Sequence, residues 1–167
     1  MSSSIQIRAA AESDTGQILA FIRELANYER LADRVTANEE DLRRFLFGPH
    51  AYAESLIAEL DGQPAGFALF FHNFSTFLGR PGIYLEDLYV REACRGHGIG
   101  LALLTRIAAI GMQRGCARVD WAVLDWNTPA IEFYERIGAR PESDWKIYRL
   151  SGEALAALAR RQPSSRA

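Results

Sequence analysis

A glycine-rich turn, Arg95-Gly-His-Gly-Ile-Gly100, separates an apolar segment that ends at Val90 from a helical pattern that continues to Met112. Glycine lets the backbone approach a ligand closely, and the first amides of a helix point their N–H groups at an anion. The turn therefore predicts a phosphate-binding site. A Walker A loop is excluded because no Gly-Lys-Ser/Thr follows. A dinucleotide-binding fingerprint is excluded because Leu101 takes the place of its third glycine.

Two adjacent carboxylates, Glu86 and Asp87, interrupt the apolar segment just before this turn. Glu86 could take a proton from a reacting group, directly or through water. In a regular strand Asp87 would face the opposite side. Tyr134 lies on a later helical segment, where a phenol could protonate a sulfur leaving group. In the simpler readings Glu86 is a salt-bridge partner and Tyr134 is a core or interface aromatic residue beside Phe133.

The hydrophobic pattern places these residues on alternating strands and helices. Strands are predicted at residues 5–9, 52–59, 63–71, 83–90, 119–124 and 145–150. Helices are predicted at 14–28, from the capping box Thr36-Ala-Asn-Glu39 to Gly48, at 101–112, from the start Asn127-Thr-Pro129 to Ile137, and after Ser151. The pair Asp61-Gly62 predicts a hairpin turn, and residues 73–82 a loop. We expect a single domain over residues 1–161, followed by a disordered tail over 162–167.

Composition excludes several classes of protein. The chain has 167 residues, of which 49% are hydrophobic, and 19 Lys and Arg against 21 Asp and Glu give a net charge of −2. This near balance does not favour nucleic-acid binding, and no apolar run suggests a membrane span or a secretory signal. Cys94 and Cys116 lack disulfide or metal spacing, so we expect a cytoplasmic protein without a metal site.

The pattern Arg95-x-x-Gly98-x-Gly100 is typical of loops that cradle the pyrophosphate of coenzyme A. With three further blocks, the sequence resembles the GCN5-related N-acetyltransferase (GNAT) superfamily from Ile5 to about Leu150. Within it, the resemblance is strongest to diamine (spermidine/spermine) and thialysine N-acetyltransferases. The other blocks are Phe21-Ile-Arg-Glu-Leu-Ala-Asn-Tyr-Glu29, Tyr84-Leu-Glu-Asp-Leu-Tyr-Val90 and Trp126-Asn-Thr-Pro-Ala-Ile-Glu-Phe-Tyr134.

This resemblance implies an α/β (α+β) fold in which helices flank a mixed, mostly antiparallel central sheet, and it implies a homodimer. It places coenzyme contacts at Leu88, Tyr89, Val90, Arg95, Gly96, His97, Gly98, Ile99, Gly100, Leu101, Asn127, Thr128, Pro129 and Ala130. It places substrate contacts at Tyr28, Glu29, Glu86, Asp120, Trp121 and Ala122, and the catalytic acid at Tyr134. Glu29, Glu86 and Asp87 together indicate a cationic acceptor, because buried charges need partners.

The chemistry of amine acetylation explains the need for these groups. An alkyl amine with a pKa of about 10.4 is almost fully protonated at neutral pH, so a carboxylate such as Glu86 must take its proton. An unpaired backbone N–H near Leu88 or Tyr89 could stabilise the oxyanion if the strand bulges there. Tyr134 could then protonate the departing thiolate. Direct transfer of this kind requires neither cysteine as a nucleophile.

We therefore expect an acyltransferase of class EC 2.3.1. It would move an acetyl group from acetyl-CoA to a primary amine of a small cationic molecule, such as a polyamine, a diamine or a thialysine-like amino acid. Two alternatives stay open at this point. One is acetylation of a protein N-terminus or lysine, and the other is a non-catalytic module that only binds acyl-CoA. The presence of both Glu86 and Tyr134 disfavours the second.

Overall fold

The computed structural model describes residues 4–161. The chain forms two compact units, one extending to residue 124 and the other starting at residue 125. The single domain expected over 1–161 stays a prediction, and the tail predicted from residue 162 lies outside the described residues. Among residues 4–161, no helix is long and apolar enough to cross a membrane.

The first unit is built on a five-stranded sheet. Its strands, in spatial as well as sequence order, are β1 (Ile5–Ala9), β2 (Glu54–Leu60), β3 (Gln63–Ser75), β4 (Arg80–Val90) and β5 (Val119–Trp121). Neighbouring strands are antiparallel except β4 and β5, which are parallel. The prediction of a mixed, mostly antiparallel sheet is thus confirmed.

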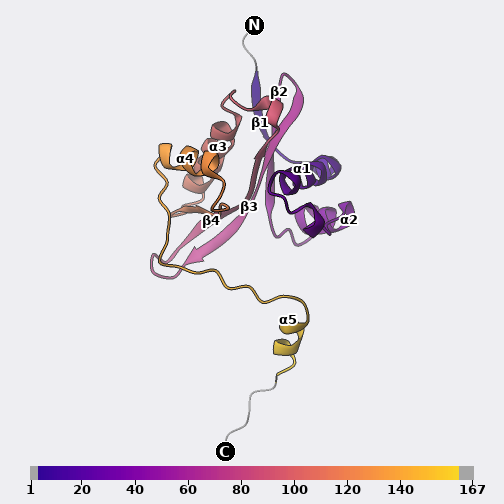
Figure 1. Ribbon diagram of the computed structural model, residues 1–167, viewed down its shortest axis with the longest axis vertical. Helices are drawn as coiled ribbons and strands as arrows, with labels where there is room; N and C mark the ends of the chain where they lie inside the picture. The colour runs from indigo at the N-terminus through magenta and orange to yellow at the C-terminus, as the bar shows by residue number, and fades with distance from the viewer. Residues whose placement is uncertain (1–3, 162–167) are drawn as a thin grey trace, which may run out of the picture. The chain divides into compact units, whose positions relative to one another are not determined.

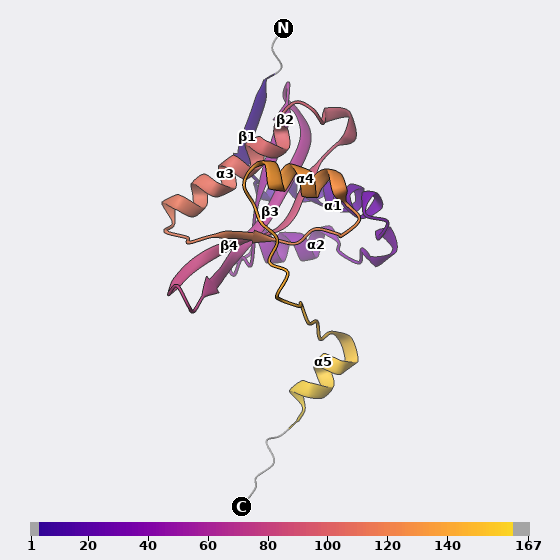
Figure 2. The same cartoon turned by 60° about the vertical axis from the view of Figure 1, so that its left-hand side comes forward.

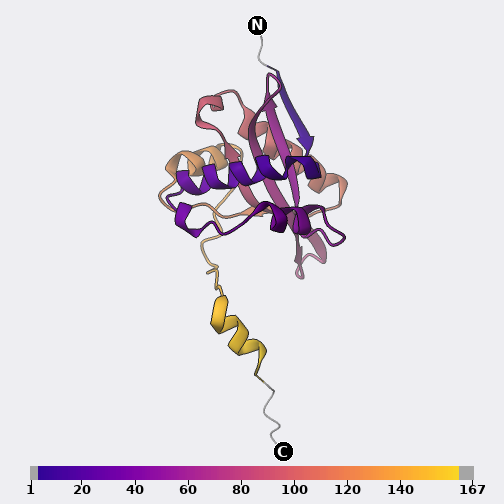
Figure 3. The ribbon, with the colours of Figure 1, turned by 90° about the vertical axis from the view of Figure 1, so that its right-hand side faces the viewer.

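Helices cover both faces of this sheet (Figure 1). On one face lie α1 (Thr15–Tyr28) and α2 (Glu39–Leu42), which run side by side across the strands in Figure 3. On the other face lies α3 (Ile99–Gln113), which contacts strands β1 to β4. Short helical turns cover Glu12–Asp14, Ala32–Arg34, Arg43–Phe47 and Glu92–Cys94. The second unit contains α4 (Thr128–Arg136) and α5 (Gly152–Ala159).

The core on the α1 face consists of Ile18 and Phe21 from the helix and Ile57 and Phe67 from the sheet, all fully buried. Phe21 and Phe67 stack with their ring centroids 5.4 Å apart. Full burial of each such side chain contributes about 1.5–3 kcal/mol. This packing therefore holds α1 firmly against the centre of the sheet.

Arg91, the residue after β4, makes a second connection between α1 and the sheet. Its guanidinium donates to Glu24 through Nε (3.0 Å to Oε2) and Nη2 (2.8 Å to Oε1), and Nη1 donates to the Pro64 carbonyl (2.8 Å). The same group lies 4.8 Å from the centroid of the Phe21 ring. A bidentate, stacked arginine is geometrically specific, so Arg91 fixes the end of α1 relative to the end of β4.

The predicted helix boundaries need two corrections. The second helix is capped by Asn38, whose Oδ1 accepts from the Asp41 amide at 2.9 Å, and not by Thr36. Asparagine is the stronger N-cap, and the acidic first turn after it suits the helix dipole. At α1 the cap position is Asp14 as predicted. Its carboxylate, however, bonds Arg8 and the Ala11 amide instead of the first turn of the helix.

Several strand predictions also differ from the structure. Residues 73–82 are mostly strand, because β3 and β4 continue as a long hairpin past the end of β2 (Figure 2). The fifth strand ends at Trp121 instead of residue 124. Residues 145–150 form no strand, although Trp145, Ile147 and Tyr148 suit one and are exposed. A strand needs a neighbour to satisfy its backbone groups, and none of the described residues pairs with this segment.

Candidate active site

The strand β4 has a β-bulge at Glu86. Leu85 pairs with Phe70 and Asp87 pairs with Leu69, so Glu86 is the extra residue that has no partner on β3. A bulge bends its strand and changes the direction of the side chains beside it. The bulge therefore falls at the carboxylate that the sequence identifies as a candidate base, and not at Leu88 or Tyr89.

Because of the bulge, Glu86 and Asp87 face the same side of the sheet. Leu69 packs on the α1 face, and Asp87 shares this face because directly paired residues do. Phe71 and its partner Tyr84 also share it, with their rings 5.2 Å apart. Glu86 follows Tyr84 by two residues and so faces α1 as well. The expectation that Asp87 faces away from Glu86 is wrong, because the extra residue removes the alternation at this point.

Glu29 completes a cluster of three carboxylates. Burial and the negative charges of Glu86 and Glu29 raise the pKa of the Asp87 carboxyl to about 7. Burial also raises the pKa of Glu29. Among residues 4–161, none of these three carboxylates bonds to an arginine, lysine or histidine side chain. We call Glu29, Glu86 and Asp87 the acidic cluster; its unbalanced negative charge suits a cationic ligand.

The end of α1 fixes the position of Glu29. The Leu31 amide donates to the Ala26 carbonyl at 2.8 Å, and the Arg30 amide donates to the Asn27 carbonyl at 3.1 Å. These two bonds form a Schellman motif with Arg30 in the left-handed region, at a φ of 61°. Glu29 is the C-cap residue of this motif. Its carboxylate thus stands at the negative end of the helix dipole, where a carboxylate is unfavourable.

Beyond Leu85, one edge of β4 has no neighbouring strand among residues 4–161. The parallel pairing with β5 covers only residues 83–85 of β4. The Arg91 amide donates to the Ala65 carbonyl, so Arg91 and Ala65 form a hydrogen-bonded pair. Pairs alternate along an antiparallel ladder, which directs the N–H groups of Leu88 and Val90 away from β3. They face the open edge, where a ligand could bind to the backbone.

The turn after β4 has the geometry of a phosphate cradle. Gly96 and Gly98 adopt left-handed φ angles of 79° and 82°, and a Cβ on either would meet nothing within 4 Å. Gly98 is the N-cap of α3. Within the described part of the chain, the amides of Ile99, Gly100 and Leu101 donate to no protein acceptor. Free amides and open space fit the pyrophosphate of coenzyme A.

Two side chains of this turn bond to backbone groups. The Nδ1 atom of His97 lies 3.2 Å from the Cys94 carbonyl and 3.0 Å from the Arg95 carbonyl. The Nε atom of Arg95 donates to the Val90 carbonyl at 3.0 Å. The guanidinium carbon of Arg95 also lies 4.7 Å from the centroid of the Tyr28 ring. His97 therefore shapes the turn itself, whereas Arg95 connects the turn to β4 and α1.

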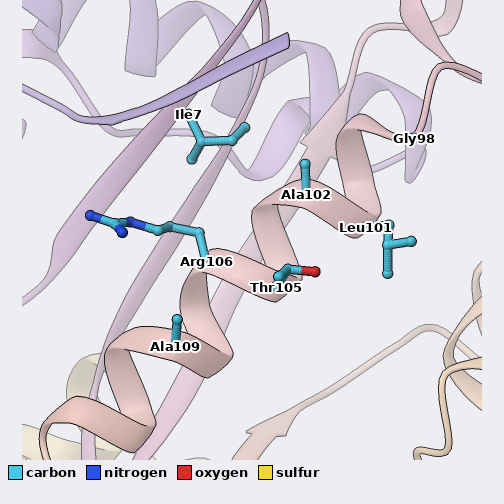
Figure 4. A pocket seen from close by; sticks show the side chains of 7 residues that line it. All are labelled: Ile7, Gly98, Leu101, Ala102, Thr105, Arg106 and Ala109. Carbon is cyan, nitrogen blue, oxygen red and sulfur yellow. The ribbon is translucent and has the colours of Figure 1, made fainter.

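A shallow depression of about 530 Å³ runs from Gly98 along α3 towards β1 (Figure 4). Ile7 of β1 faces it, and the other lining residues are Leu101, Ala102, Thr105, Arg106 and Ala109. It contains part of the phosphate cradle but no member of the acidic cluster. The predicted acceptor residues therefore do not lie in this depression.

The remaining predicted residues lie elsewhere. Asp120 on β5 bonds Arg118 (2.8 Å) and Asn73 (3.0 Å), so its charge is already balanced. Trp121 ends β5 and Ala122 follows it. In the second unit, residues 127–130 form the start of α4, and Tyr134 lies near its end with its ring 5.5 Å from that of Phe133. The roles of all these residues stay predictions.

The fold and the phosphate cradle beside an open strand edge define an acyltransferase that uses coenzyme A. Residues 15–139 match the model of the acetyltransferase (GNAT) family, so the chain belongs to this family and is an acetyl-CoA-dependent N-acetyltransferase. This confirms the resemblance noted in the sequence.

Two relatives and one solved structure document the similarity. Thialysine N-epsilon-acetyltransferase from Sus scrofa is 41% identical, over 93% of this chain and 98% of its own length. L-ornithine N5-acetyltransferase from Arabidopsis thaliana is 31% identical, over 92% of this chain and 87% of its own. An integron cassette protein from the mobile metagenome of V. cholerae superposes with a TM-score of 0.79 at 29% identity, covering 96% of this chain and 99% of that protein.

Removing the Asp87 carboxylate should change how stability depends on pH. The folded-state pKa of Asp87 is about 7, well above the unfolded value of about 3.9. The folded protein therefore holds an extra proton between these values. Its free energy of unfolding should fall as the pH rises from about 4 to about 7. The Asp87→Asn variant should lack the part of this decrease in the free energy of unfolding that comes from Asp87. Urea unfolding of both proteins between about pH 4 and about pH 7 measures the difference.

The exposed carboxylate Asp33 provides the control substitution Asp33→Asn, which makes the same chemical change outside the acidic cluster. If Asp87→Asn and the wild-type protein lost stability equally over this range, Asp87 would not carry the raised pKa.

A side chain at Gly98 should prevent coenzyme binding without unfolding the protein. Gly98→Val places a branched side chain in the cradle and strains a left-handed residue by about 1–3 kcal/mol. Gly79→Val is the matched control, because Gly79 has a φ of 61° and equally open surroundings at the tip of the β3–β4 hairpin. Calorimetric titration with CoA should show lost binding only for Gly98→Val. Equal binding by the two variants would refute the cradle assignment.

Proposed function

We propose that the acceptor is a primary amine of a small molecule that carries a further positive charge, as in a thialysine-like amino acid, a diamine or a polyamine. The observation that carries the proposal is the acidic cluster. Its three carboxylates come from two elements, and each lacks a cationic protein partner within residues 4–161. A dicationic acceptor would supply the missing charge and lower the pKa of Asp87.

The names of the relatives agree with this acceptor class. One is named for thialysine and another for L-ornithine. Both compounds are amino acids with a second amino group, so each can present one ammonium group to a carboxylate while the other reacts. The homodimer and the cytoplasmic location expected from the sequence stay predictions beside this proposal.

The acidic cluster also supplies a proton acceptor. A general base works best when its pKa lies near the working pH, and the pKa of Asp87 is about 7. Glu86 lies on the same face, and its negative charge acts on Asp87. We assign removal of the amine proton to this pair, directly or through a water molecule, and binding of the second cation to Glu29.

Acetyl-CoA, when bound, supplies the acetyl group as a thioester, which the free amine can attack. The amides of the phosphate cradle would hold its pyrophosphate. The Leu88 N–H, which faces the open edge of β4, would donate to the carbonyl oxygen as negative charge develops on it. Tyr134 would give a proton to the sulfur as the thiolate departs.

A panel of amines tests the acceptor class. Initial rates of acetyl-CoA consumption should give kcat/KM values about ten- to hundredfold higher for thialysine, ornithine and spermidine than for a monoamine of equal length that carries no second charged group, since each charge-assisted hydrogen bond contributes about 1.5–3 kcal/mol. Glu29→Gln should raise KM for the dicationic acceptors and change kcat little. Asp33→Asn, at an exposed carboxylate, should leave both parameters unchanged.

Other outcomes of this panel would refute the proposal. A preference for peptides would indicate protein acetylation. CoA binding without turnover on any amine would indicate a binding module.

The Tyr134 hydroxyl has a separate test. If it is the acid, Tyr134→Phe should lower kcat by about 10²- to 10⁴-fold and leave the affinity for CoA unchanged. Tyr148, an exposed tyrosine of the same unit, provides the control substitution Tyr148→Phe. Unchanged kcat in Tyr134→Phe, measured on the best acceptor of the panel, would remove this residue from the mechanism.

A further inference from the structure

The side chain of Arg95 is directed at groups outside the phosphate cradle. Its Nε donates to the Val90 carbonyl at 3.0 Å, and its guanidinium carbon lies 4.7 Å from the centroid of the Tyr28 ring. Its positive charge also acts on the Tyr89 hydroxyl, where it opposes the rise in pKa that burial causes. These contacts belong to β4 and α1.

The two direct partners of Arg95 lie near different substrates, one near the coenzyme and one near the acceptor. Val90 pairs with Gly66 in a non-hydrogen-bonded position, so its carbonyl faces the open edge of β4, where the coenzyme is expected. Tyr28 is the last residue of α1, and Glu29 of the acidic cluster follows it directly. Arg95 therefore joins the coenzyme turn to the helix end that carries an acceptor carboxylate.

We propose that Arg95 is a positioning residue that couples the binding of the two substrates through its stacking on Tyr28. A coenzyme that orders the turn at residues 95–101 also fixes Arg95. The stacked guanidinium then fixes Tyr28 and, through the adjoining backbone, Glu29. Coupling of this kind is reciprocal, so an acceptor bound at Glu29 strengthens coenzyme binding by the same factor.

The acceptor half of this inference rests on the proposed function, whereas the coenzyme half does not. A cation over an aromatic ring at an exposed site contributes enough for about a two- to fivefold change in a binding constant. An uncharged tyrosine on another element would thus affect coenzyme affinity without touching the coenzyme. A direct phosphate contact from Arg95 would give no such effect.

A double-mutant cycle on CoA affinity tests the coupling. In the wild-type background, Tyr28→Leu should weaken CoA binding about two- to fivefold in calorimetric titration. In the Arg95→Gln background, the same change should have no further effect. Tyr28→Phe keeps the ring and should keep CoA affinity within about twofold. Thermal unfolding of each variant checks that it is folded, and the comparison of Tyr28→Leu with Tyr28→Phe needs no Arg95 variant.

The acceptor side gives a second measurement. Arg95→Gln should raise KM for the best amine at saturating acetyl-CoA, whereas loss of a phosphate contact alone would raise KM only for acetyl-CoA. Additive effects of Tyr28→Leu and Arg95→Gln on CoA affinity would overturn the proposal. So would equal losses in Tyr28→Leu and Tyr28→Phe, because the hydroxyl and not the ring would then be responsible.

The failure of this inference differs from the failure of the proposed function. If no amine is acetylated but the cycle on CoA affinity shows coupling, the acceptor class is wrong and the link from Arg95 to Tyr28 stands. If dicationic amines are acetylated but the cycle is additive, the acceptor class stands and the positioning role is wrong.

Discussion

The site depends on the point at which β4 leaves regular pairing. The bulge at Glu86 and the end of the β5 ladder at Leu85 fall on neighbouring residues. The bulge turns two carboxylates towards α1, and the missing ladder exposes backbone N–H groups on the following residues. Without the bulge, Asp87 would face α3 and only Glu86 would remain beside α1. The acidic cluster and the open edge therefore arise at the same point of β4, the first from the bulge and the second from the end of the β5 ladder.

The two helix ends near the bulge of β4 carry opposite charges. The N-terminus of α3 offers free amides and the positive end of its dipole, which suit an anion. The C-terminus of α1 carries Glu29 at the negative end of its dipole, which suits a cation. The packing of Phe21 on Phe67 and the contacts of Arg91 with Glu24 fix α1 against the sheet. A net charge of −2 therefore conceals two oppositely charged surfaces.

The sequence predicted the fold well because its signals were local. The hairpin turn at Asp61-Gly62, the glycines before α3 and the helical period of α1 depend on short-range physics and lie where they were expected. The capping error at Thr36 was also local, since a stronger cap stood two residues away. The strand expected at 145–150 failed because a strand depends on a partner, and hydrophobic alternation does not specify one.

The candidate site was predictable as a set of residue types but not as an arrangement. Adjacent carboxylates in an apolar strand pointed to Glu86 and Asp87. No residue pattern indicated that the strand bulges between Leu85 and Asp87, and the alternation rule therefore put Asp87 on the wrong face. The contact of the Arg95 side chain with Tyr28 could not be predicted for a similar reason. Its partner Tyr28 lies 67 positions away in the sequence, and only the fold brings the two together.

The end of α1 has two features that lower the stability of the folded protein. Arg30 occupies a left-handed position, at a φ of 61°, that glycine would adopt without strain and that costs another residue about 1–2 kcal/mol. Glu29, the residue before Arg30, is partly buried at the C-terminus of α1, where the helix dipole disfavours a carboxylate. It has no cationic protein partner among residues 4–161. Both features disfavour the folded state when no ligand is present. They are consistent with a helix end whose missing positive charge comes from the substrate.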